Sequence, residues 1–101
     1  MLELRPNCEH CNKDLAPDAN DAMICTFECT FCLECVNTVL KNVCPNCGGN
    51  FCQRPVRPST NWKNDNYLEK YPARQSRFHR PVDLEAHQEL LKCQAAMSQP
   101  N

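Results

Sequence analysis

Eight of the ten cysteines in this chain of 101 residues fall into four closely spaced pairs within its first half. Domains of this size bury proportionally little apolar surface, so they often need disulfides or metal ions to stay folded. The chemistry of the cysteines therefore constrains the fold more than any other feature. The pairs, in chain order, are Cys8 and Cys11, Cys25 and Cys29, Cys32 and Cys35, and Cys44 and Cys47.

The cysteines can form disulfides in an oxidising compartment or metal thiolates in a reducing one. The amino-terminal residues MLELRPNCEH contain no apolar stretch typical of a secretory signal peptide. No later segment approaches the roughly 18 apolar residues that indicate a membrane span. We therefore expect a cytoplasmic protein with reduced thiols and no membrane contact, and this expectation favours metal binding over disulfides.

The spacing within the pairs suits zinc. Zinc binds four sulfurs in a tetrahedron, and a two-residue spacer lets both sulfurs of a pair face one ion. The segment CPNCGG at residues 44–49 is typical of such a knuckle, because Pro45 fixes the bend and Gly48 permits a positive φ after the last sulfur. Four pairs supply two four-coordinate sites, so we expect two Zn²⁺ ions.

The middle cysteines can be divided in two ways. Dividing them into two pairs gives an interleaved order, in which pairs one and three bind one ion and pairs two and four bind the other. Alternatively, the triplet Cys29, Cys32 and Cys35 is similar to a ferredoxin iron–sulfur run, but the ferredoxin pattern places its fourth cysteine much closer than Cys44 lies here. The interleaved order uses all eight cysteines. Its predicted ligands are Cys8, Cys11, Cys32 and Cys35 in the first site, and Cys25, Cys29, Cys44 and Cys47 in the second.

Two cysteines and the histidines remain outside this assignment. We expect Cys52 to be a small, half-buried residue on the last strand and Cys93 to be part of a helical packing face. Cys52 is also a substitute ligand if Cys44 or Cys47 is wrongly assigned. His10 is predicted to point to solvent, and neither His79 nor His87 has a partner at ligand spacing.

Short secondary-structure elements separate the cysteine pairs. Ala22, Met23 and Ile24 predict a strand, residues 34–43 carry apolar side chains at the spacing of one helical face, and residues 51–54 predict a final strand. The predicted fold class is a small α+β zinc-stabilised domain, a RING-like cross-brace with a short β-hairpin and one short helix. We expect this double zinc-binding domain to occupy residues 1–54.

The composition changes after Cys52. Residues 55–81 hold four prolines and no apolar period, so they predict an extended segment that wraps around its own domain. Asp83 can cap a helix that runs to about residue 97. The second unit, residues 55–101, is therefore predicted to be an extended segment followed by a helix at about 83–97, whose packing stripe is Ala86, Leu90, Cys93 and Met97.

The segments LRPNCE, ICTFECTFC and CPNCGG give residues 2 to about 58 a specific resemblance. They resemble a bacterial family of small cysteine-rich proteins of unknown function, which implies zinc binding and a bacterial cytosolic origin but no reaction. A wider resemblance is to RING fingers, many of which recruit ubiquitin-conjugating enzymes. That recruiting pattern has an aliphatic residue between the first two cysteines and often an arginine after the last. This chain has Glu9, His10 and Gly48 there, so ubiquitin-ligase activity is not expected.

Charge is distributed unevenly along the chain. Residues 1–52 carry three basic and seven acidic side chains, whereas residues 53–101 carry eight basic and five acidic ones. Thiolate ligands would make the first half still more anionic, which disfavours contact with a phosphate backbone. Four-cysteine sites also leave no open coordination position for a substrate. We therefore expect a non-catalytic zinc module that binds another protein and has no small-molecule substrate.

Two other functions are compatible with the sequence. Oxidation of the thiolates could release zinc, which would make the protein a redox sensor. The tail could instead bind nucleic acid, because it interleaves basic with aromatic residues. The basic and aromatic residues concerned are Arg54, Arg57, Lys63, Arg74, Arg77 and Arg80, with Trp62, Tyr71 and Phe78.

Overall fold

The computed structural model describes residues 1–97 and contains one small antiparallel sheet. Its strand order is β2-β1-β3, with β1 (Ala22–Ile24) in the centre, β2 (Thr30–Cys32) on one side and β3 (Cys52–Gln53) on the other. Met23 lies opposite Phe31 on β2 and Gln53 on β3. The strand predicted at residues 22–24 is confirmed, and the last strand is shorter than predicted.

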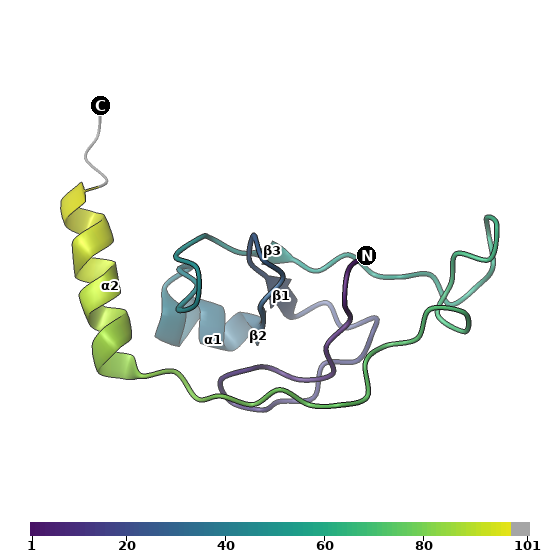
Figure 1. The fold of residues 1–101 in the computed structure, drawn as a ribbon, viewed down its shortest axis with the longest axis horizontal. Helices are drawn as coiled ribbons and strands as arrows, with labels where there is room; N and C mark the ends of the chain where they lie inside the picture. The colour runs from purple at the N-terminus through teal and green to yellow at the C-terminus, as the bar shows by residue number, and fades with distance from the viewer. Residues whose placement is uncertain (98–101) are drawn as a thin grey trace.

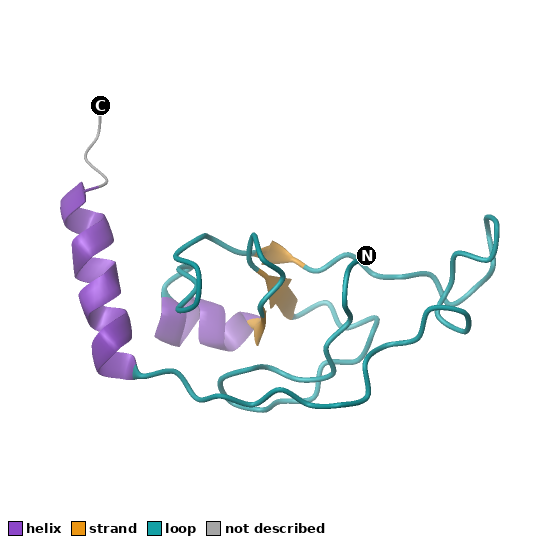
Figure 2. Ribbon diagram, viewed as in Figure 1, coloured by secondary structure: helices purple, strands orange, loops and turns teal. Residues whose placement is uncertain are grey.

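Strand β2 leads directly into the first helical segment (Figure 2). Helix α1 (Leu33–Cys35) continues as a π-helical turn, η1 (Val36–Leu40). It ends three residues earlier than predicted because Lys41 and Asn42 adopt left-handed backbone conformations, with φ values of 54° and 61°. The Asn42 N–H donates to the Val36 carbonyl at 3.0 Å and closes this end.

The apolar core lies between the sheet and this helix. Phe31 and Phe51 meet edge to face, with ring centroids 5.6 Å apart and an interplanar angle of 82°. Leu15, Val36 and Leu40 are buried around them. Cysteines make up much of the remaining core, which agrees with the expectation that apolar burial alone is modest here.

Arg54 is one of the most deeply buried side chains, with only 1% of its surface exposed. Its guanidinium donates to the carbonyls of Arg5 and Ala16, both at 2.9 Å, and its backbone N–H donates to Ala22 at 2.8 Å. Burial, followed by the nearby charge of Arg57, lowers the pKa of Arg54. Arg54 thus joins three separate parts of the first half through hydrogen bonds.

Residues 74–82, which we call the strap, lie beside residues 4–12 along one edge of the molecule (Figure 1). The backbone N–H of Arg74 donates to Leu4 at 2.9 Å, and that of Arg80 donates to Glu9 at 2.8 Å. The Asn7 side chain donates to the Phe78 carbonyl at 3.0 Å and accepts from the Phe78 N–H at 3.2 Å. The predicted wrapping segment therefore contacts its own first half.

Helix α2 (Leu84–Met97) follows the strap, and the Asp83 carboxylate accepts from the Ala86 N–H at 3.2 Å, as a capping residue does. The helix docks through polar side chains. His87 Nε2 lies 2.8 Å from the Leu40 carbonyl, and Gln94 donates to the Gly48 carbonyl at 2.8 Å.

The predicted packing stripe of α2 is wrong. Ala86 and Cys93 are exposed and Leu90 is half-buried, whereas His87 is buried. The fourth member of the stripe, Met97, has a side chain outside the described residues. The helix meets backbone carbonyls at the end of η1 and beside Cys47 instead of an apolar surface, so hydrogen-bonding residues face inward. Within residues 1–97, no helix is long and apolar enough to span a membrane.

Replacing Arg54 tests its structural role. Arg54→Met keeps most of the side-chain volume but leaves two carbonyls without their donor, so we expect the free energy of unfolding to fall by roughly 2–4 kcal/mol. Chemical denaturation of the metal-loaded protein measures this change. Arg77→Met removes an exposed ion pair with Asp14 and two exposed hydrogen bonds to Asn12. Because water can replace these exposed contacts, this change should cost less than about 1 kcal/mol. Equal losses in the two variants would contradict the assigned role of Arg54.

Candidate metal centres

The first cysteine cluster contains all four residues predicted for the first site. The sulfurs of Cys8, Cys11, Cys32 and Cys35 all lie within 4.8 Å of one another. Those of Cys11 and Cys32 are 3.7 Å apart. A tetrahedron with zinc–sulfur bonds of about 2.3 Å has edges of about 3.8 Å. The residues therefore fit a tetrahedral metal ion of zinc's size.

The turn that carries Cys8 and Cys11 is closed by two backbone hydrogen bonds. The Asn12 N–H donates to the Cys8 carbonyl and the Cys8 N–H donates to the Lys13 carbonyl, both at 2.9 Å. Asn12 has a φ of 66°. The positive φ falls on the residue after the second sulfur, where asparagine is tolerated better than most side chains.

The turn that carries Cys44 and Cys47 repeats this geometry. The Gly48 N–H donates to the Cys44 carbonyl and the Cys44 N–H donates to the Gly49 carbonyl, both at 2.8 Å. Gly48 has a φ of 79°, as the sequence predicted. A Cβ at Gly49 would lie 2.9 Å from the Thr26 hydroxyl, so this close approach also requires glycine.

The second cluster unites three of the four residues predicted for the second site. The sulfurs of Cys25, Cys44 and Cys47 lie within 4.8 Å of one another, and Cys29 is not part of that group. The Cys29 backbone N–H nevertheless donates to the Cys25 sulfur at 3.3 Å. Cys29 therefore contacts the second cluster through its backbone, and it lies directly before the first residue of β2.

Backbone N–H groups point at the sulfurs of the second cluster. Phe27 donates to Cys25 at 3.3 Å, Asn46 to Cys44 at 3.4 Å, and Gly49 to Cys47 at 3.4 Å. In each case the donor lies two residues after the cysteine. Such hydrogen bonds stabilise a thiolate and orient it toward a metal ion.

Burial and crowding oppose the loss of protons from these thiols. Burial raises the pKa of Cys35, and its hydrogen bond with Cys32 and the charge of Cys8 raise it further. Burial likewise raises the pKa of Cys44. At exposed Cys11, the effect of burial is outweighed by hydrogen bonds, among them one from the backbone of Lys13, and the pKa is lowered. A divalent cation between the sulfurs would reverse the unfavourable contributions, because it compensates the thiolate charges.

The remaining cysteines and histidines lie apart from both clusters within the described chain. Cys52 is exposed and not half-buried as expected, since it sits on a two-residue edge strand whose neighbour Phe51 takes the buried position. His10 was predicted to point to solvent. Instead its Nδ1 accepts from the Val82 N–H at 2.9 Å, and its carbonyl lies 3.1 Å from His79 Nε2. His10 and His79 therefore help to hold the strap against the first half of the chain.

A hydrogen bond that the sequence did not predict joins the two knuckles. Asn46, in the second knuckle, donates from its side chain to the buried Glu9 carboxylate at 2.9 Å. Glu9 lies between the first two cysteines and also faces Arg5 at 3.6 Å. The position between Cys8 and Cys11 therefore carries a structural carboxylate, which no spacing rule identifies.

Removing one clustered sulfur tests the first centre. Cys32→Ser should lower the metal content by about one ion per chain and unfold much of the first half, because structural zinc contributes ~10–16 kcal/mol in small peptides. Cys52→Ser, at an exposed position outside both clusters, should change neither property. Native mass spectrometry and amide NMR dispersion report the two effects. An unchanged metal content in Cys32→Ser would exclude this residue as a ligand.

Comparison with known proteins places these clusters in a family context. Residues 1–57 match the family described as "Protein of unknown function (DUF1272)". The chain is also similar to the uncharacterised protein R02474 of Rhizobium meliloti strain 1021, with 57% identity over 81 residues that cover 80% of this chain and 89% of the relative. No solved structure matches the chain significantly.

Proposed function

Because the chain belongs to DUF1272, a family of proteins of unknown function, we propose a role from its own residues: a non-catalytic zinc-binding module that mediates protein–protein interaction. The observation that supports this role best is the complete set of four sulfurs in the first cluster, at distances that suit one tetrahedral ion. Thiolates are soft ligands, and a tetrahedral all-sulfur set is typical of zinc.

In this proposal Cys29 joins the second cluster as its fourth ligand when metal binds. The first cluster already combines the first and third cysteine pairs, and the second combines Cys25 with the fourth pair. With Cys29 added, the order is interleaved and forms a RING-like cross-brace. The bound ions would compensate thiolate charge and hold the hairpin, the two knuckles and α1 together.

The absence of catalysis is inferred from the ligand set. Four protein sulfurs fill a tetrahedral zinc ion, so no coordination position stays open for water or a substrate. We therefore expect the ions to be structural, and the protein to act through its surface. The bacterial relative supports a bacterial origin, and the thiol-rich composition is consistent with a reducing cytoplasm.

Protein binding is favoured over nucleic-acid binding because the arginines of the strap face their own first half. Arg74 pairs with Glu3 at 2.8 Å, and Arg77 pairs with Asp14 at 2.7 Å. The guanidinium of Arg80 stacks on Phe78, 5.0 Å from the ring centroid. These groups are already engaged, which weakens the phosphate-binding surface that the composition of the tail suggested.

Metal analysis of untagged protein, purified without added metal, tests the proposal. Elemental analysis and native mass spectrometry should find two zinc ions per chain, and Cys29→Ser should retain only about one firmly bound ion. Iron with acid-labile sulfide would overturn the structural role in favour of redox chemistry. One zinc ion in the wild type, unchanged in Cys29→Ser, would reject the second site.

A further inference from the structure

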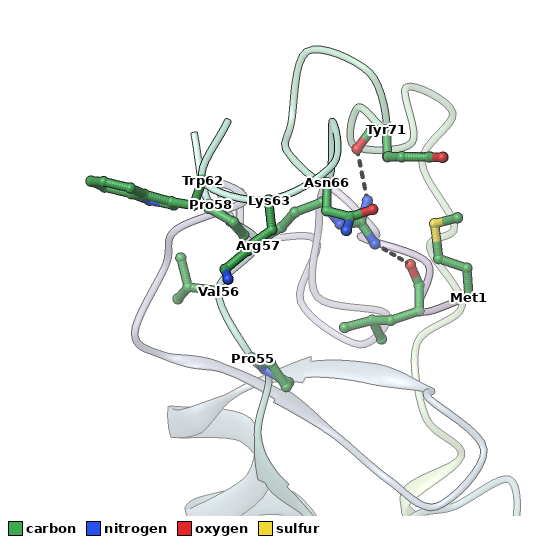
Figure 3. Close-up of a pocket in the computed structure, with 10 residues that line it drawn as sticks. Met1, Pro55, Val56, Arg57, Pro58, Trp62, Lys63, Asn66 and Tyr71 are labelled. Carbon is green, nitrogen blue, oxygen red and sulfur yellow. Dashed lines mark hydrogen bonds between the residues drawn. The ribbon is translucent and has the colours of Figure 1, made fainter. Parts of the chain in front are cut away.

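A pocket that the metal centres do not explain lies at the end of the molecule opposite α2 (Figures 1 and 3). Its volume is about 470 Å³, within the range of ligand-binding pockets. It lies among the first two residues, the proline-containing segment 55–58 and the loop 59–71. The lining residues are Met1, Leu2, Pro55, Val56, Arg57, Pro58, Trp62, Lys63, Asn66 and Tyr71.

Hydrogen bonds from Arg57 hold the walls of this pocket in place. Its guanidinium donates to the carbonyls of Tyr71 and Leu2, both at 2.7 Å (Figure 3). The Leu68 N–H donates to the Pro58 carbonyl at 2.9 Å and closes the base of the loop. A pocket fixed in this way loses little conformational freedom on binding, which favours affinity.

The walls are mainly apolar, and three of their side chains are at least half exposed. Met1 has 89% of its surface exposed, Trp62 has 74% and Val56 has 50%. Pro55 and Pro58 also line the pocket (Figure 3). Exposed aromatic residues in a concave, mainly apolar surface are a common mark of a protein-interaction site, because burying them on binding yields a large hydrophobic gain.

The charge of the pocket is entirely positive. Lys63 and Arg57 line it, and no aspartate or glutamate does. Arg57 donates to backbone carbonyls, and neither residue forms an ion pair within the described chain. The ammonium group of Lys63 is therefore available to a carboxylate on a partner, whereas the guanidinium of Arg57 is engaged with two carbonyls and adds positive charge to the wall.

We propose that this pocket binds an acidic segment of a partner protein, which places a proline or aliphatic side chain against Trp62 and a carboxylate beside Lys63. This inference rests on the proposed interaction function and specifies its docking site. Aromatic-lined grooves favour extended, proline-containing segments, which lose little entropy on binding. Two cations are too few to follow a nucleic-acid strand, and a symmetric contact with a second copy would bring Lys63 close to its equivalent.

The test begins with the metal-loaded, full-length protein and a displayed library of random heptapeptides. Selection on the wild type, followed by comparison of each enriched peptide on wild type and Trp62→Ala, should yield peptides that combine aspartate or glutamate with proline or aliphatic residues and bind the variant weakly. If peptides bind wild type and Trp62→Ala equally, the docking site is elsewhere and this inference fails while the interaction function survives. If no peptide is enriched, this inference fails, whereas the zinc-binding part of the proposed function depends on the metal analysis and is unaffected.

Trp62 also provides the quantitative readout, because it is the only tryptophan in the chain. Titration with a synthetic enriched peptide should shift its fluorescence to shorter wavelength as the indole leaves water. Lys63→Glu should weaken binding about tenfold or more, as loss of a central contact does. A peptide with lysine in place of its acidic residues should bind the wild type weakly and Lys63→Glu better.

Matched controls separate the pocket from general surface effects. Phe27→Ala removes a side chain as exposed as Trp62, at 74%, but outside the pocket. Lys41→Glu reverses an exposed charge at the end of η1. Neither should change peptide affinity. If Lys41→Glu and Lys63→Glu lose the same peptide affinity, the effect is due to net charge and the inference is overturned. Tighter binding of oligothymidylate than of any acidic peptide, measured by Trp62 fluorescence, would also overturn it.

Discussion

Sulfur crowding is the constraint on which the rest of this structure depends. Four thiols lie within 4.8 Å of one another in the first cluster, and burial together with neighbouring thiols raises the pKa of Cys35. Such a group stays protonated, or it shares a cation that balances several negative charges at once. The surrounding backbone is consistent with the second state, because N–H groups already point at the sulfurs of the other cluster. Metal binding and folding are therefore expected to be coupled.

A core this small depends on hydrogen bonds that cross long stretches of sequence. Arg54 reaches the carbonyls of Arg5 and Ala16, and Asn7 pairs with both backbone groups of Phe78. His87 makes a similar long-range contact at the end of η1, where its ring meets the Leu40 carbonyl. Each of these polar side chains is almost fully buried, so each satisfies backbone groups that would otherwise lose their water without gaining a partner.

Local rules predicted much of the first half. The two-residue spacer and the glycine after Cys47 predicted the knuckle, and Gly48 indeed has a positive φ. The short apolar run at residues 22–24 predicted β1, and Asp83 predicted the start of α2. These features depend on neighbouring residues alone. The docked face of α2 could not be found in this way, because His87 and Gln94 bind carbonyls more than forty positions away, and helical periodicity reports only apolar contacts.

The strap explains why the charge asymmetry of the sequence does not produce a broad cationic surface. Glu3 and Asp14, in the acidic half, take up Arg74 and Arg77 from the basic half. Beyond the strap lies the pocket around Trp62, which is lined by Lys63 and Arg57 and by no aspartate or glutamate, although Asp65 and Glu69 belong to the same loop. The pairing that fastens the tail thus leaves Lys63 outside the ion pairs of the described chain, beside the most exposed aromatic ring of the tail. A short acidic segment matches that arrangement, whereas a long polyanion would also meet the first half, which carries more acidic than basic side chains.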